Sequence, residues 1–111
     1  MMKLEIGNWR CNKLKATMYN YNTWIKYEKE EILIPKLEKI LEESGFTIIK
    51  KVEHFFEVQG YTGIWLLAES HFAVHTFPEE DKIYLEISSC VKKYFDSFLE
   101  KFEKNLSTYM L

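Results

Sequence analysis

The sequence LLAESHFAVHTFPEE, residues 66–80, carries several reactive side chains within an apolar and β-branched run. A carboxylate, a hydroxyl and two imidazoles occur there as Glu69, Ser70, His71 and His75. Serine can act as a nucleophile, and histidine transfers protons near neutral pH. The period of the run is typical of a sheet rather than of a surface loop, so this chemistry is expected on strands.

A hairpin is predicted around these groups, because FAVHTF is followed by PEED and then by KIYLEISSC. With the turn centred on residues 79–80, residues whose numbers sum to about 159 face each other. Ser70 then lies opposite Ser89 and beside Cys90. The register alone therefore brings a hydroxyl and a thiol close together.

His75, opposite Tyr84 in this register, cannot reach Ser70 within one straight strand. Five extended residues span about 16 Å, and the odd offset sends the two side chains to opposite faces. Two arrangements stay open: the chain changes direction at Ser70, or the His75 imidazole serves the Ser70 of another subunit.

Other interpretations of these groups are weaker. A zinc site from His71 and His75 is disfavoured, because on a strand the two rings lie about 13 Å apart. A Ser-His-Asp hydrolase is disfavoured because no Gly-x-Ser-x-Gly turn surrounds Ser70. The structural alternatives are a hydrogen-bonded strand histidine and a buried cysteine sulfur.

Two helices are predicted from apolar residues at helical spacing. The first covers residues 24–44, where Pro35 kinks the helix or marks its start near Ile34 and Gly45 follows the end. The second covers residues 91–106, with Ser89 as its N-cap.

Strands are predicted from β-branched and aromatic runs over residues 46–58 and 64–68, besides the hairpin. The first of these strands is expected to place on one face Phe46, Ile48, Val52, His54 and Phe56. Segments 3–10 and 13–20 also have an extended pattern. The resulting fold class is α+β: an antiparallel β-sheet with two long helices packed on one face.

Length and charge limit the function further. The 111 residues are expected to form one domain, and a net charge of −2 gives no general attraction to nucleic acid or anionic lipid. The longest apolar run, residues 64–68, is far shorter than the ~20 residues that a membrane span needs. We expect a cytoplasmic protein in which Cys11 and Cys90 form no disulfide.

The combination LAESH, HTFPE and a cysteine twenty positions after the serine resembles the small bacterial S-adenosylmethionine decarboxylases. These are pyruvoyl-dependent lyases of spermidine and polyamine biosynthesis. The similarity runs without gaps from about Gly45 to Cys90. Histidine, glutamate and cysteine at +5, +9 and +20 from the serine form a specific joint pattern.

The resemblance implies a zymogen that cuts itself between Glu69 and Ser70. The Ser70 hydroxyl attacks the Glu69 carbonyl, the resulting ester is eliminated, and hydrolysis leaves a covalent pyruvoyl group derived from Ser70. Thr62 and His75 match the family's processing residues.

The resemblance also implies the decarboxylation chemistry. The pyruvoyl ketone forms a Schiff base with the substrate and accepts the electrons released with carbon dioxide. Cys90 matches the catalytic proton donor, Glu79 a carboxylate that binds the ribose, and Phe56 a ring that stacks on adenine. In the family these sites are shared across a homodimer, with the pyruvoyl group and Cys90 from one protomer and His75, Glu79 and Phe56 from the other.

The chain departs from the family pattern near the amino-acid end of the pocket. Met18 stands near an acidic position, Val91 replaces the glycine after Cys90, and the final strand is missing. Residues 3–10 are expected to supply the missing sheet edge. Ornithine or arginine therefore stays open as substrate, with Glu53 and Glu57 as carboxylates for the distal cation. A non-catalytic, unprocessed relative with a binding or regulatory role is the third possibility.

Overall fold

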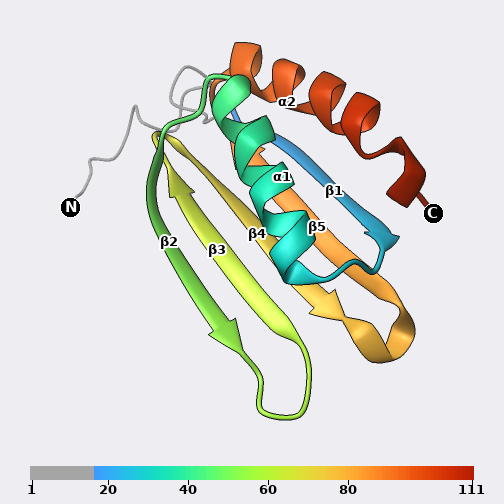
Figure 1. The fold of residues 1–111 in the computed structure, drawn as a ribbon. Helices are drawn as coiled ribbons and strands as arrows, with labels where there is room; N and C mark the ends of the chain where they lie inside the picture. Colours follow the sequence, from blue (N-terminus) through green and yellow to red (C-terminus); the bar gives the residue numbers. More distant parts are fainter. Residues whose placement is uncertain (1–16) are drawn as a thin grey trace, which may run out of the picture.

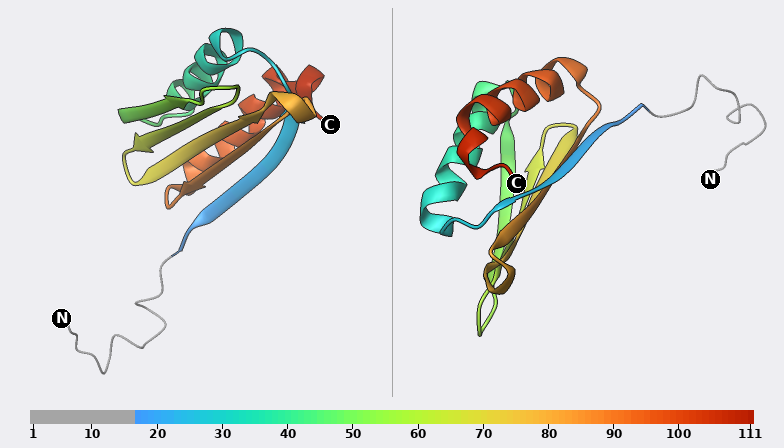
Figure 2. Two further views of the ribbon diagram at one scale, coloured as in Figure 1. Left: turned by 90° about the horizontal axis from the view of Figure 1, so that it is seen from below. Right: turned by 90° about the vertical axis from the view of Figure 1, so that its right-hand side faces the viewer.

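The computed structural model describes residues 17–111, which form one five-stranded antiparallel sheet and two helices (Figure 1). Along the chain the elements are β1 (Tyr19–Lys26), α1 (Glu30–Glu43), β2 (Ile48–Phe55), β3 (Tyr61–Leu67), β4 (Ser70–Phe77), the 3-10 turn η3 (Pro78–Glu80), β5 (Lys82–Ser89), α2 (Lys92–Asn105) and the 3-10 turn η4 (Ser107–Tyr109). The strand order is β1-β5-β4-β3-β2. Figure 2 shows both helices on the same side of the sheet, so the predicted fold class is confirmed.

The core lies between the helices and one face of the sheet. On β5 every second residue is buried, because side chains alternate between the two faces of a strand. Each helix adds an apolar stripe at a spacing of three and four residues. The buried side chains include Ile83, Leu85 and Ile87 from β5, Leu33, Leu37 and Leu41 from α1, and Phe95, Phe98 and Phe102 from α2. This layer fixes which residues of each strand face the helices and which face away.

Helix α1 is shorter than the sequence predicted. The expected start at residue 24 is wrong, because Trp24 and Ile25 belong to β1 and alternate between its two faces. Pro35 does not mark the start either: it lies inside the helix, which begins at Glu30 with two acidic residues in its first turn. Such residues suit the positive end of the helix dipole.

The end of α1 agrees with the prediction. Gly45 has a φ of 113°, a conformation that glycine adopts without steric cost. The Gly45 N–H donates to the Glu42 carbonyl and the Phe46 N–H to the Leu41 carbonyl, both at 3.1 Å. These two bonds form a Schellman motif and direct the chain into β2.

Strand β2 corrects a predicted face. The register shifts between Ile48 and Lys50, which indicates a β-bulge. Phe46 is buried against the helices, whereas Val52 pairs with Ile64 on the opposite face and is 65% exposed. Because the bulge reverses the alternation, Phe46 and Ile48 do not share a face with Val52, His54 and Phe56.

Helix α2 begins at Lys92 with Val91 as N-cap, so the predicted N-cap role of Ser89 is wrong. Ser89 is the last residue of β5, but its Oγ does accept a hydrogen bond from the Val91 N–H at 2.9 Å. After α2, Met110 forms a β-bridge to Ile25 on the outer edge of β1.

The predicted strand over residues 3–10, its pairing with the sheet edge and Cys11 lie outside the described residues. Within residues 17–111 no helix is both long and apolar enough to cross a membrane.

Candidate active site

A two-residue turn between β3 and β4 presents the predicted cleavage point. Leu67 pairs with Ser70, which leaves Ala68 and Glu69 to reverse the chain. Glu69 has a φ of 60°, in the left-handed region that costs a residue with a side chain about 1–2 kcal/mol. The peptide bond between Glu69 and Ser70 therefore follows a strained residue.

The Ser70 hydroxyl lies in a buried pair with Ser89. The two residues face each other across β4 and β5, as the register predicted. Ser70 Oγ donates to Ser89 Oγ at 2.7 Å, and the residues are 7% and 0% exposed. The hydroxyl predicted to be the nucleophile is thus fixed on the helix-covered side of the sheet.

Cys90, one residue beyond Ser89, lies beside the carbonyl that Ser70 would attack. Its Sγ is 3.5 Å from the Glu69 carbonyl oxygen and 3.7 Å from Glu69 Oε1. The thiol is free and exposed. A weak donor is therefore aimed at the oxygen on which negative charge would develop.

Thr62 and His75 form a second polar pair, on the face of the sheet that the helices leave uncovered. They are register partners between β3 and β4, and Thr62 Oγ1 lies 3.0 Å from His75 Nδ1. On the other side His75 faces Tyr84, as predicted, with ring centroids 6.1 Å apart. The structure brings together the two residues matched to the family's processing roles.

Within one chain the structure does not bring His75 to Ser70. Both residues belong to the continuous strand β4, and the reversal of the chain occurs at the turn before Ser70. Ser70 faces the buried side and His75 the uncovered side. The change of direction at Ser70 that the sequence left open, which would have brought His75 to it within one chain, is therefore not observed.

Phe56 and Glu79 lie with His75 at one end of the sheet. Phe56 directly follows β2, is 51% exposed, and packs edge-on against His54 with ring centroids 4.6 Å apart. Glu79 is exposed in the turn η3 that joins β4 to β5. Figure 1 shows these two connections at one end of the sheet and the β3–β4 turn at the other.

Comparisons with known proteins identify the family of the chain. The family model of S-adenosylmethionine decarboxylase matches residues 14–109. The chain belongs to the S-adenosylmethionine decarboxylase family. Among the similar curated proteins, the S-adenosylmethionine decarboxylase proenzyme of Archaeoglobus fulgidus is 39% identical over 80 residues, which are 68% of this chain and 71% of that protein. The proenzyme of Clostridium botulinum strain Loch Maree is 41% identical over 70 residues, 63% of this chain and 60% of that protein.

The fold is similar to the crystal structure of the adenosylmethionine decarboxylase from Aquifex aeolicus. The TM-score is 0.57 at 21% identity, and the superposition covers 78% of this chain and 82% of that one. The resemblance inferred from residues 45–90 is thus confirmed, as are the fold class and the assignment to carboxy-lyases of polyamine biosynthesis.

One carboxylate considered for a different decarboxylase substrate is engaged elsewhere. Glu53 lies on the helix-covered side, where its Oε2 accepts from the Tyr61 hydroxyl at 2.6 Å and lies 3.9 Å from Lys51 Nζ. Burial and this hydrogen bond raise the pKa of Tyr61 well above its usual range. Because Glu53 points away from the face that carries His75, it is poorly placed to bind the distal cation of ornithine or arginine.

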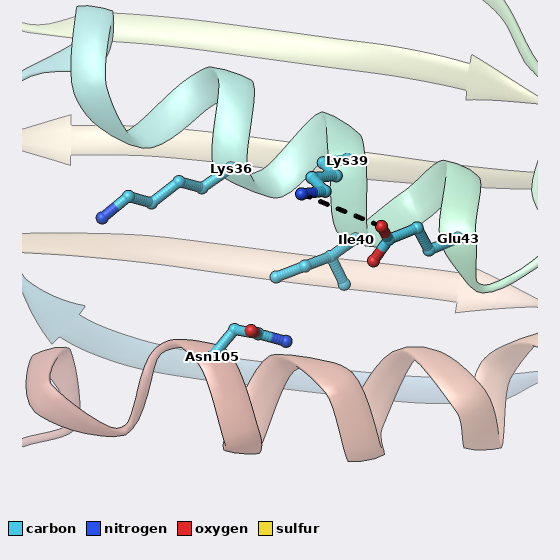
Figure 3. A pocket seen from close by; sticks show the side chains of 5 residues that line it. All are labelled: Lys36, Lys39, Ile40, Glu43 and Asn105. Atoms are coloured by element: carbon cyan, nitrogen blue, oxygen red, sulfur yellow. Dashed lines mark ion pairs between the residues drawn. The ribbon is translucent and has the colours of Figure 1, made fainter.

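The pocket between the two helices is separate from the family site. Figure 3 shows it lined by Lys36, Lys39, Ile40 and Glu43 of α1 and by Asn105 of α2. Its volume is about 230 Å³, and Lys39 and Glu43 form an ion pair of 4.0 Å across its rim. None of the predicted site residues lines this pocket.

The uncovered face of the sheet is apolar to a degree that the sequence analysis missed. Ile64 and Leu66 on β3 are 47% and 50% exposed, next to Val52 of β2. The apolar run IWLLA lies mostly in β3, an interior strand of the sheet, and only alternate residues of this strand are covered by the helices. A strand that is apolar on both faces indicates a second covering layer, and that signal was present in the sequence.

Proposed function

We propose that this chain is a proenzyme that cleaves itself between Glu69 and Ser70 and then decarboxylates S-adenosylmethionine. The observation that carries the proposal is the arrangement around one carbonyl. A strained Glu69 places its carbonyl oxygen 3.5 Å from the Cys90 thiol, and the next residue is the buried Ser70. Strain, an oxyanion donor and a fixed hydroxyl are what an attack on a backbone carbonyl requires.

Cleavage proceeds in two stages. The Ser70 Oγ bonds to the Glu69 carbonyl carbon, the peptide C–N bond breaks, and the hydroxyl proton ends on the new Ser70 amine. A base then removes the Ser70 α-proton, the Cβ–O bond breaks, and the Glu69 carboxylate leaves. Water replaces the nitrogen as ammonia is released, which leaves a pyruvoyl group at the new terminus. We assign the base to His75, held by its 3.0 Å contact with Thr62.

The residues around this terminus fit a pyruvoyl group. When formed, the group supplies a ketone conjugated to an amide, which acts as an electron sink for loss of carbon dioxide. The Cys90 thiol, already directed at the Glu69 carbonyl, is placed to return a proton to the substrate carbon. Phe56 and Glu79 are exposed and free to hold the adenine ring and the ribose hydroxyls. Both relatives are S-adenosylmethionine decarboxylase proenzymes, which supports S-adenosylmethionine as the substrate.

The active sites are shared across a homodimer in this proposal. Ser70 and Cys90 lie at one end of the sheet, and Thr62 and His75 lie toward the other on the uncovered face. Two copies that pack these faces together about a two-fold axis bring the His75 end of one against the β3–β4 turn of the other, and such an isologous interface makes two equal sites. The partner's His75 then approaches Ser70 from the face opposite to its hydroxyl, which suits removal of the α-proton rather than activation of the hydroxyl. The exposed Ile64, Leu66 and Val52 supply the apolar surface for this packing.

A cytoplasmic location belongs to the same proposal. Cys90 must remain a free thiol to donate a proton, and free thiols persist in reducing compartments. No role for nucleic acid or membrane enters the mechanism.

Intact mass under denaturing conditions tests the cleavage. The expected products are chains of 69 and 42 residues, the second blocked at its amino end. Ser70→Ala should remain whole, whereas Ser107→Ala, an exposed serine in η4, should cleave like the wild type. Freshly made wild-type protein that stays at full length would contradict the proposal.

Release of carbon dioxide from labelled substrates tests the specificity. We expect release from S-adenosylmethionine and none from ornithine or arginine. Cleaved protein that prefers either of those amino acids would overturn the substrate assignment while leaving the cleavage intact.

A further inference from the structure

The Ser70 hydroxyl has a dedicated partner that neither the sequence motif nor the mechanism above uses. We propose that Ser89 is a positioning residue for self-cleavage, which orients the Ser70 hydroxyl toward the Glu69 carbonyl. This inference rests on the proposed function and adds a residue to its first step.

The hydrogen bonds around Ser89 support this role. Its Oγ accepts from the Ser70 hydroxyl at 2.7 Å and from the Val91 N–H at 2.9 Å. A hydroxyl oxygen has two acceptor lone pairs, so both are occupied. Whichever of the two hydroxyls donates, the Ser70 oxygen keeps at least one lone pair available for attack on a carbonyl carbon.

Burial makes the pair rigid. Ser89 is fully buried and Ser70 is 7% exposed. In such a place a serine hydroxyl that lost its partner would turn to whichever rotamer satisfied it, because an unpaired buried polar group is costly. The Ser89 contact therefore selects one orientation of the Ser70 side chain.

Three consecutive residues at the end of β5 thus hold the two reacting groups. Ser89 binds the hydroxyl, Cys90 contacts the Glu69 carbonyl oxygen, and the Val91 N–H fixes Ser89. Val91 is also the N-cap of α2, so the start of this helix anchors the arrangement. In the first step the Ser70 oxygen–carbon bond forms as the hydroxyl proton leaves toward the departing nitrogen, and Ser89 is unchanged afterwards.

The test compares rates of self-cleavage in refolded or freshly synthesised full-length chain, followed by intact mass. Ser89→Ala should cleave about tenfold more slowly, the factor expected for one oriented hydrogen bond in the transition state. Ser89→Thr, which keeps the hydroxyl, should restore the rate to within about threefold of the wild type. Ser44→Ala is the matched control, because Ser44 is also buried and its hydroxyl donates to the Ile40 carbonyl at 2.7 Å, away from the site. It should lose stability without losing cleavage rate.

Hydroxylamine, which cuts esters, separates the two stages. It should not accelerate Ser89→Ala, because that variant is slow before the ester forms. It should accelerate His75→Ala, because that variant lacks the base for the later elimination.

The outcomes separate the inference from the proposed function. If the wild type stays whole, the proposed function fails and this inference fails with it. If the wild type cleaves and Ser89→Ala keeps pace within about twofold, the inference alone is wrong. It is also wrong if Ser89→Thr is as slow as Ser89→Ala, or if hydroxylamine restores cleavage of Ser89→Ala.

Discussion

The two ends of strand β4 differ in burial and in what their polar groups contact. At its start Ser70 is buried, bonded to Ser89, and next to a strained Glu69. Toward its end His75 lies on the uncovered face and contacts Thr62. In the proposed function the first end supplies the nucleophile and the carbonyl that it attacks, whereas the second supplies a base that lies away from both in its own chain.

In the proposed function, each chain therefore carries two incomplete halves of one site. About 16 Å of extended strand and opposite faces separate the halves, so no side-chain rotation joins them. A second copy whose uncovered face packs on the first would complete both.

Mixing two inactive variants gives the largest effect. Ser70→Ala and His75→Ala should each be inactive alone, but co-expression should restore about a quarter of wild-type activity, because random pairing makes half of the dimers mixed and each mixed dimer has one intact site. Activity and cleaved chain would both be measured. The control pair, Ser70→Ala with Cys90→Ala, places both changes at the same end, so its turnover should not rise above that of Cys90→Ala alone, although the Cys90→Ala chain is itself cleaved. Recovery in the control pair, or none in the first, would break the comparison.

A charge on the uncovered face should separate the two subunits of the proposed dimer. Leu66→Glu buries a carboxylate in the proposed interface, which would convert the dimer to monomer and stop both cleavage and turnover. Light scattering gives the mass, and intact mass gives the cleavage. Ile32→Glu is the matched control, because Ile32 is similarly exposed, at 45%, but lies on α1. A monomeric Leu66→Glu protein that still cleaves would show that one chain suffices.

Removal of the Cys90 thiol should slow decarboxylation more than self-cleavage. Cys90→Ala loses the proton donor of the decarboxylation, for which a loss of about 100-fold in turnover is expected. Its effect on cleavage should be below about tenfold, because an S–H group at 3.5 Å is a weak oxyanion donor. Turnover per cleaved subunit and the cleavage rate would be measured on the same preparation. Equal losses in both rates would mean that the thiol has no separate role in turnover.

The register of the site could be predicted because a hairpin with a short turn leaves little freedom. The Ser70–Ser89 and His75–Tyr84 pairings followed from the position of the PEED turn. The bulge near Ile48 could not be predicted from the alternation, and it moved His54 and Phe56 to the uncovered face. The Trp24–Ile25 pair was assigned to a helix because two adjacent apolar residues fit either period.

The roles of the site residues came from the family resemblance, whereas their grouping came from the fold. The hairpin register placed Ser89 opposite Ser70, but it did not show that the two hydroxyls would contact each other. In the structure Ser89 Oγ contacts Ser70 Oγ and also accepts from the Val91 N–H.

Substitution of Tyr61 should leave both parts of the proposed site intact. It is buried on the helix-covered side, and burial together with the Glu53 hydrogen bond raises the pKa of its hydroxyl above its usual range. Since the unfolded tyrosine titrates near pH 10, the neutral hydroxyl stabilises the fold below that pH, and this stabilisation is lost as the pH rises toward the folded pKa. Tyr61→Phe should cost about 1 kcal/mol at pH 7 and weaken the decline in stability above pH 10. Urea unfolding at both pH values measures this, and cleavage at pH 7 should be unchanged. An equal decline in stability above pH 10 in both proteins would exclude Tyr61 as the source of the decline. Loss of cleavage in Tyr61→Phe would show that the site also depends on packing on the helix-covered side of the sheet.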